Sequence, residues 1–140
     1  MAPNDVKAGM RLAFFFGVLT DYTSILIQLA AQPWHRSHED IAMALDELRL
    51  RDPQVAHAFY NLALSRHEYL AYDDAHALGV KCIWGLGNMG TSEAIAALAK
   101  LAKVGNPIFT ENVEDQLDRI EQRSPSDDVR RAIERARDGE

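Results

Sequence analysis

Apolar residues recur every three or four positions along almost the whole chain, and no stretch sustains the alternation of a half-buried strand. Such spacing collects the apolar side chains on one stripe of a helix. Pro33, Pro53, Pro107 and Pro125 stand where one periodic segment gives way to the next. The pattern predicts an all-α chain of about seven helices.

Residues that favour helix starts stand at these boundaries. Ser37 opens "SHEDIAMALDEL" with Asp40 three positions later, which approximates a capping box. Asp52 precedes Pro53 in "DPQVAHAFYNLALS", and Thr91 opens "TSEAIAALAKLAK". We therefore expect helices to begin after Ser37, Asp52 and Thr91.

The predicted helices repeat in pairs. "PQVAHAFYNLA" (53–63) aligns with "SEAIAALAKLA" (92–102), and "TSILIQLAA" (23–31) aligns with "AHAFYNLAL" (56–64), at intervals of 39 and 33 residues. The helices between them align as "IAMALDEL" and "CIWGLGNM". A two-helix repeat of this length is typical of an α-solenoid, in which each pair packs against its neighbours.

The segment "IWGLGNMGTSEAIAALAKLA" and its weaker copy "MALDELRLRDPQVAHAFYNLA" resemble HEAT repeats of the short bacterial kind, also found in phycobilisome lyase-like proteins. The resemblance covers residues 21–123. It implies one domain over 1–140, a right-handed α-α superhelix (a HEAT-like solenoid) of about three helix pairs. A helical cap is expected over 1–20 and a polar cap over 124–140.

The glycines of "KCIWGLGNMGTSEAIAALAK" raise the question of a phosphate-binding loop. Such a loop follows a strand and opens a helix, whereas Gly85 and Gly87 lie inside a helical pattern. We predict that they allow close helix approach. Gly90 is expected to end the helix in a left-handed conformation, before Thr91 caps the next one.

The charge distribution indicates the kind of partner. The net charge is −6, and residues 37–79 hold eight carboxylates against three arginines. A negative field repels phosphate backbones and attracts basic surfaces. Nucleic acid is therefore excluded as a partner, and a protein with a basic surface is expected.

Cysteine usage and the start of the chain bear on location. Cys82 is the single cysteine, which rules out an internal disulfide and suits a reducing cytoplasm. Lys7 and Arg11 precede the apolar run Leu12–Leu19 in the order of a secretion signal, but that run is too short to span a bilayer. We expect a cytoplasmic protein with no membrane segment.

No enzyme motif emerges. Cys82 lies on an apolar stripe, and no serine has the glycine flanks of a nucleophile elbow. His38-Glu39 and His67-Glu68 resemble the His-Glu motifs that hold a di-iron centre in deoxyhypusine hydroxylase, a HEAT-repeat enzyme. That family has four such motifs, whereas this chain has two, in different helical phases. Because out-of-phase pairs are not expected to converge, we predict no metal and no cofactor.

The repeat register predicts a binding surface. In HEAT stacks the second helices of successive pairs line the concave face that commonly binds partners. Leu78, Cys82, Leu86 and Met89 face inward in this register, which leaves Trp84 on an outward stripe, although Trp84 could instead pack between repeats. The predicted partner-binding stripe comprises Asp40, Met43, Glu47, Lys81, Trp84 and Asn88, and, less securely placed, Asn112, Asp115 and Arg119.

Two further segments are candidates for contact. The link 66–74 is longer than its counterpart in the preceding repeat and carries Tyr69 and Tyr72, which we predict to contact the partner; the alternative is that Tyr69 and Leu70 close the seam. Phe14, Phe15 and Phe16 spread around a helical turn, so one core face cannot bury all three. A homodimer through this helix is one expectation.

These observations favour a non-catalytic protein-binding module, similar to adaptors and to immunity proteins that neutralise bacterial toxins. Two alternatives follow from the resemblances. One is a metal-dependent, hydroxylase-like enzyme that uses His38, Glu39, His67 and Glu68. The other is a bilin lyase-like chaperone.

Overall fold

The computed structural model describes residues 20–73, 76–123 and 125–139. Within these ranges the chain is all-helical, which confirms the predicted class. The α-helices are α2 (Thr20–Ala30), α3 (His38–Glu47), α4 (Pro53–Leu64), α5 (His76–Met89), α6 (Ser92–Ala102), α7 (Pro107–Gln122) and α8 (Asp127–Arg137), and a 3-10 helix, η1 (Glu68–Asp73), precedes α5.

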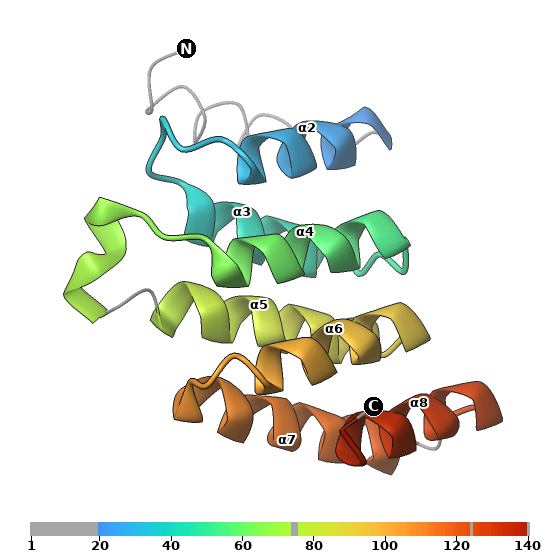
Figure 1. Ribbon diagram of the computed structural model, residues 1–140. Helices are drawn as coiled ribbons and strands as arrows, with labels where there is room; N and C mark the ends of the chain where they lie inside the picture. Colours follow the sequence, from blue (N-terminus) through green and yellow to red (C-terminus); the bar gives the residue numbers. More distant parts are fainter. Residues whose placement is uncertain (1–19, 74–75, 124, 140) are drawn as a thin grey trace.

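The helices stack side by side in two layers, from α2 at one end to α7 and α8 at the other (Figure 1). In one layer α5 lies between α3 and α7; in the other α4 lies between α2 and α6, and α8 follows α6. Each helix contacts its neighbours in the stack because its apolar stripe has no other surface on which to be buried.

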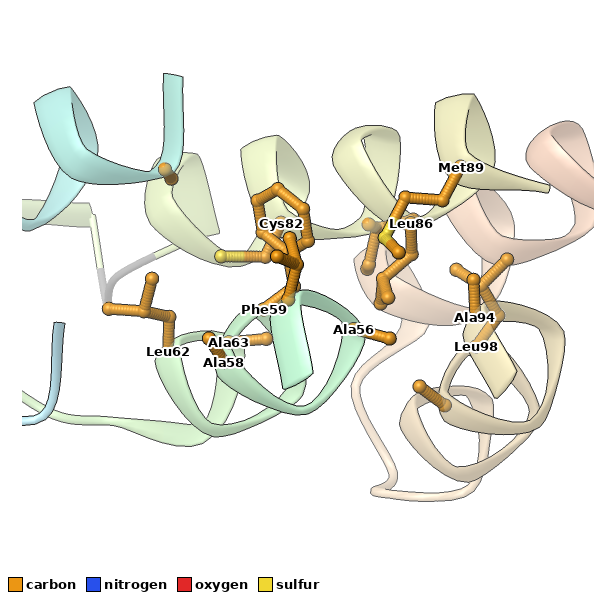
Figure 2. Close-up of a cluster of buried hydrophobic side chains, with 14 of the residues drawn as sticks. Ala56, Ala58, Phe59, Leu62, Ala63, Cys82, Leu86, Met89, Ala94 and Leu98 are labelled. Atoms are coloured by element: carbon orange, nitrogen blue, oxygen red, sulfur yellow. The ribbon is translucent and has the colours of Figure 1, made fainter. Parts of the chain in front are cut away.

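The core runs between the two layers. Phe59 and Leu62 of α4 and Cys82 and Leu86 of α5 are all at most 1% exposed. Figure 2 shows Phe59 projecting from α4 toward α5 in this cluster. Burial of one such side chain contributes about 1.5–3 kcal/mol to folding. The inward stripe predicted for α5 is confirmed.

The helix boundaries follow the predicted capping chemistry at several positions. The side chain of Asp52 accepts a hydrogen bond from the amide of Gln54 (2.9 Å), and that of Thr91 accepts one from Ala94 (3.2 Å). Gly90 has φ +62° and ends α5, as predicted, because a left-handed residue there carries no steric cost without a Cβ.

The capping box expected at Ser37 is not formed. α3 begins at His38, but the side chain of Ser37 makes no capping hydrogen bond. The backbone amide of Ser37 instead donates to Nδ1 of His35 (3.1 Å), and the amide of His38 donates to the hydroxyl of Tyr69 (3.1 Å). A tyrosine from a distant segment therefore accepts the first amide of α3, and His35 accepts the amide of Ser37 that the capping box would assign to Asp40.

The last helix covers the end of the stack through an apolar stripe and a charged tip. Ala132 and Ile133 are buried, and α8 packs on α6. The guanidinium of Arg137 contacts three carboxylates of α7, those of Glu114, Asp118 and Glu121. At the other end, residues 1–19 of the expected cap helix, with Phe14, Phe15 and Phe16, lie outside the described residues.

Candidate functional site

Side chains from α3, α5 and α7 form a continuous outer surface, which we call the tryptophan face. Helical spacing turns Lys81, Trp84 and Asn88 away from the buried stripe of α5. Each of the three forms a hydrogen bond to a neighbouring helix of the same layer. The face comprises Glu39, Asp40, Met43, Asp46 and Glu47 of α3, Lys81, Trp84 and Asn88 of α5, and Asn112, Asp115 and Arg119 of α7.

Trp84 is the largest exposed side chain of this face. It is 51% exposed, and its indole Nε1 donates a hydrogen bond to Oδ1 of Asn112 (3.0 Å). The amide of Asn112 in turn donates to the carbonyl of Ile108 (2.8 Å), which fixes its orientation. The indole is therefore held in position while much of its surface remains open to solvent. Met43 of α3 is also half exposed, at 48%.

Polar bonds connect α5 to α3 on the other side of Trp84. Nζ of Lys81 lies 2.9 Å from Oε2 of Glu39, and Nδ2 of Asn88 donates to Oδ1 of Asp46 at 2.9 Å. Since α5 is tied to α3 by these bonds and to α7 by Trp84, the three helices present their outer side chains in a set arrangement. Such preorganisation lowers the entropy lost when a partner binds.

The tryptophan face is acidic. It holds five carboxylates, those of Glu39, Asp40, Asp46, Glu47 and Asp115, against the cations Lys81 and Arg119. Arg119 lies 3.2 Å from Asp115 on the same helix, an exposed pair. Negative charge therefore exceeds positive charge on the face that carries the exposed side chains of Trp84 and Met43.

The predicted partner-binding residues of the link 66–74 lie differently. Tyr69 is partly buried and packs against the core, and its hydroxyl lies 2.5 Å from Nδ1 of His38. Leu70 is 3% exposed. The side chain of Tyr72 lies outside the described residues. Tyr69 thus closes the seam between η1 and α3, which was the alternative that the sequence left open for it.

Three histidine rings form a stack at this seam. The ring centroids of His35 and His38 are 4.2 Å apart, and those of His38 and His67 are 3.7 Å apart. The prediction that His38 and His67 do not converge is therefore wrong. Helical periodicity relates the directions of side chains only within one helix. His67 lies outside that range, in the segment after α4, which contacts the start of α3.

The contacts of these residues are structural ones. Both ring nitrogens of His38 are engaged, Nδ1 by Tyr69 and Nε2 by the carbonyl of Gln32 (2.7 Å). Glu39 turns away to Lys81, and Glu68 is exposed on η1. Among the described residues, no group of three or more His, Cys, Asp or Glu side chains is arranged to hold a metal ion.

Burial controls the ionisation of this cluster and of the cysteine. The pKa of His38 is lowered to about 4, chiefly by burial; the carbonyl of Gln32 acts in the opposite direction, and the neighbouring rings of His67 and His35 add to the lowering. The pKa of His67 is also lowered, first by burial and then by His35. Burial raises the pKa of the Cys82 thiol, which therefore stays protonated and makes a poor nucleophile.

Sequence reasoning missed Asp46, His35 and an apolar groove between α2 and α4. Asp46 directly precedes Glu47 of the predicted stripe. Its contact with Asn88 can be predicted only when the packing of α3 on α5 is known. The groove has a volume of about 800 Å³, and its lining includes Ile27, Ala30, Ala31 and Ala58. No polar motif marks it, so nothing in the sequence distinguishes these residues from core.

Comparisons of the chain with protein-family models, curated protein sequences and solved structures gave no significant match. In the part of the chain that the structure describes, no helix has both the length and the apolar character needed to cross a membrane.

Proposed function

We propose that this chain is a HEAT-like, right-handed solenoid that acts as a non-catalytic protein-binding module, of the adaptor or immunity-protein kind. The partner binds on the tryptophan face. The observation that carries the proposal is Trp84, a half-exposed indole held by Asn112 at the centre of a surface built from three helices. Tryptophans with these properties dominate the binding energy of many protein interfaces.

Two physical properties of Trp84, its exposure and its fixed position, favour a binding role. Leaving an indole exposed forfeits the burial energy of a large aromatic side chain. A hydrogen bond from Nε1 to Asn112 reduces the side-chain entropy that binding would otherwise remove. Both features favour a surface whose apolar centre is covered by another molecule.

The charges around Trp84 select the partner. Five carboxylates against two cations give this face a negative potential, which accelerates association with basic proteins and disfavours acidic ones. We therefore propose a partner that presents a basic surface with an apolar or aromatic contact for Trp84.

The test compares capture by the wild-type protein and by Trp84→Ala. Immobilised protein is incubated with the proteome of the native host, and the retained proteins are quantified. Truncation of a central interface tryptophan typically costs 2 kcal/mol or more, so we expect a retained basic protein whose affinity for Trp84→Ala is about 30-fold lower.

Trp34→Ala is the matched control, because Trp34 is similarly exposed, at 43%, and lies between α2 and α3 outside the tryptophan face. We expect this variant to retain the partner as the wild type does. Equal retention by Trp84→Ala and the wild type, or equal loss from both tryptophan variants, would contradict the proposal.

A further inference from the structure

The stack of three histidines joins two connecting segments of the chain. His35 lies in the segment that leads into α3, His38 is the first residue of α3, and His67 follows α4 just before η1. His35 is 1% exposed and His38 is fully buried. The stack is therefore the point at which the η1 segment is attached to the start of α3.

Hydrogen bonds assign a neutral form to the central ring. Nε2 of His38 lies 2.7 Å from the carbonyl of Gln32, which can only accept, so Nε2 carries the hydrogen. Nδ1 is then a lone pair that accepts the hydroxyl hydrogen of Tyr69. The oxygen of Tyr69 accepts the backbone amide of His38 at the same time (3.1 Å).

Both flanking rings also carry a hydrogen on Nε2. Nε2 of His35 donates to the carbonyl of Leu29 (2.6 Å), and its Nδ1 accepts the amide of Ser37. The hydroxyl of Ser65 donates to the carbonyl of Leu62 (2.7 Å) and so accepts from Nε2 of His67 (3.0 Å). His35 and His38 thus enter the stack uncharged, and Nε2 of His67 carries a hydrogen.

We propose that this stack is a pH-sensitive latch, in which protonation of His38 releases Tyr69 and detaches the η1 segment from α3. A proton on Nδ1 removes the lone pair that accepts the Tyr69 hydroxyl. The phenol hydrogen must then turn away from Nδ1 and loses the acceptor that held it. The new positive charge also lies buried between two rings. Opening of the segment relieves both costs because it returns the imidazolium to water.

The surrounding charges do not remove this cost. His35 and His67 face the two sides of His38, and their own protonation would add like charges. Arg36, Glu39 and Asp40 act on Tyr69, whose pKa is raised mainly by burial. Glu39 itself is paired with Lys81 of α5, 2.9 Å away, and so is directed away from the stack.

The direction of the effect follows from the pKa of His38, which folding lowers from 6.5 to about 4. A base whose pKa is lowered in the folded state binds protons more readily when the segment is open. The latch is therefore closed above pH 6.5 and weakens as the pH falls toward 4. For one proton and these two values, opening at pH 5.0 is favoured about 30-fold over opening at pH 7.5.

Hydrogen exchange of the wild-type protein tests the latch. The amide of Leu70 donates to the carbonyl of His67 (3.0 Å) and reports on closure. Exchange is measured at pH 7.5 and pH 5.0 and corrected for intrinsic rates. We expect the protection of Leu70 to fall about 30-fold at pH 5.0, while amides of α6 change little. An unchanged protection at Leu70, or an equal fall in α6, would overturn the proposal.

Two variants locate the effect. Tyr69→Phe removes the hydroxyl, and we expect low protection at both pH values with less than a threefold pH effect. His57→Gln alters an exposed histidine of α4 that is outside the stack, and we expect it to keep the wild-type response. A Tyr69→Phe protein that retains the full pH response would contradict the proposal.

A measurement on the unmodified protein remains decisive if Tyr69→Phe does not fold. Nitrogen NMR of the imidazoles should show His38 with its hydrogen on Nε2 and a titration midpoint near 4. A midpoint at or above 6.5, or a hydrogen on Nδ1 at neutral pH, would refute the latch.

Discussion

At the scale of single residues, Gly85 shows how a missing side chain shapes the packing. A Cβ on Gly85 would lie 2.5 Å from Cζ of Phe59, closer than real Cβ contacts. The helix therefore accepts the conformational cost of glycine so that α4 and α5 can approach across the phenyl ring. The sequence predicted a close approach at this glycine, and the structure adds the identity of the opposing residue.

Gly85→Ala should consequently destabilise the protein, although alanine is the better helix former by about 1 kcal/mol. Phe59 is fully buried and its ring atoms lie where the new Cβ would be, so we expect a net loss of about 1–3 kcal/mol in the free energy of unfolding, measured with urea. In a Phe59→Leu background the same substitution should cost less, because the ring atoms that clash are gone. A Gly85→Ala protein that is more stable than the wild type would show that the close contact with Phe59 does not exclude a Cβ at this position.

At the scale of the helix, the sequence identified which segments are helical but not always how their ends are satisfied. Asp52 and Thr91 cap α4 and α6 as predicted, because a capping side chain reaches amides only two or three residues away. Ser37 precedes α3 but does not cap it. At the start of α3 the amide of His38 donates to the hydroxyl of Tyr69, 31 residues further along the chain. The local sequence carries no signal for that contact.

Asn106 caps the start of α7, and its replacement tests how much such a cap contributes to stability. Oδ1 of Asn106 accepts from the amides of Ile108 (2.9 Å) and Phe109 (3.4 Å). Asn106→Ala should lower the free energy of unfolding by about 1 kcal/mol. Ser37→Ala removes a side chain with no capping bond and should cost clearly less, as measured by urea unfolding. An equal decrease in the free energy of unfolding for the two variants would contradict the capping role of Asn106.

At the scale of the whole molecule, the two-layer stack gives each helix only neighbouring partners, so the terminal helix protects the end of the core. α8 buries Ala132 and Ile133 and packs on α6, while Arg137 connects its end to α7. The apolar stripe of Val129, Ala132, Ile133 and Ala136 is the surface that packs. Stability of such stacks depends on interfaces between neighbours.

A chain that ends at Arg123 should therefore unfold at a lower urea concentration. Loss of Ile133 alone removes about 1.5–3 kcal/mol of burial, and the newly exposed surface of α6 adds to this loss. A chain that ends at Asp138 keeps all of α8. Of the described contacts it loses the hydrogen bond from Lys103 to the carbonyl of Gly139 and the one from the amide of Gly139 to Ala136, so its midpoint should match the full chain. Identical midpoints for both truncations would show that α8 does not stabilise the stack.

The sequence by itself determined the helical class, several helix boundaries and the inward stripe of α5, because periodicity and capping depend on residues within about one helical turn. It also placed Trp84 on an outward stripe. Only the tertiary structure decided that Asn112, 28 positions away, holds the indole and that Tyr69 bonds to His38. Such contacts depend on how helices and links pack against one another, and that packing has no local signature in the chain.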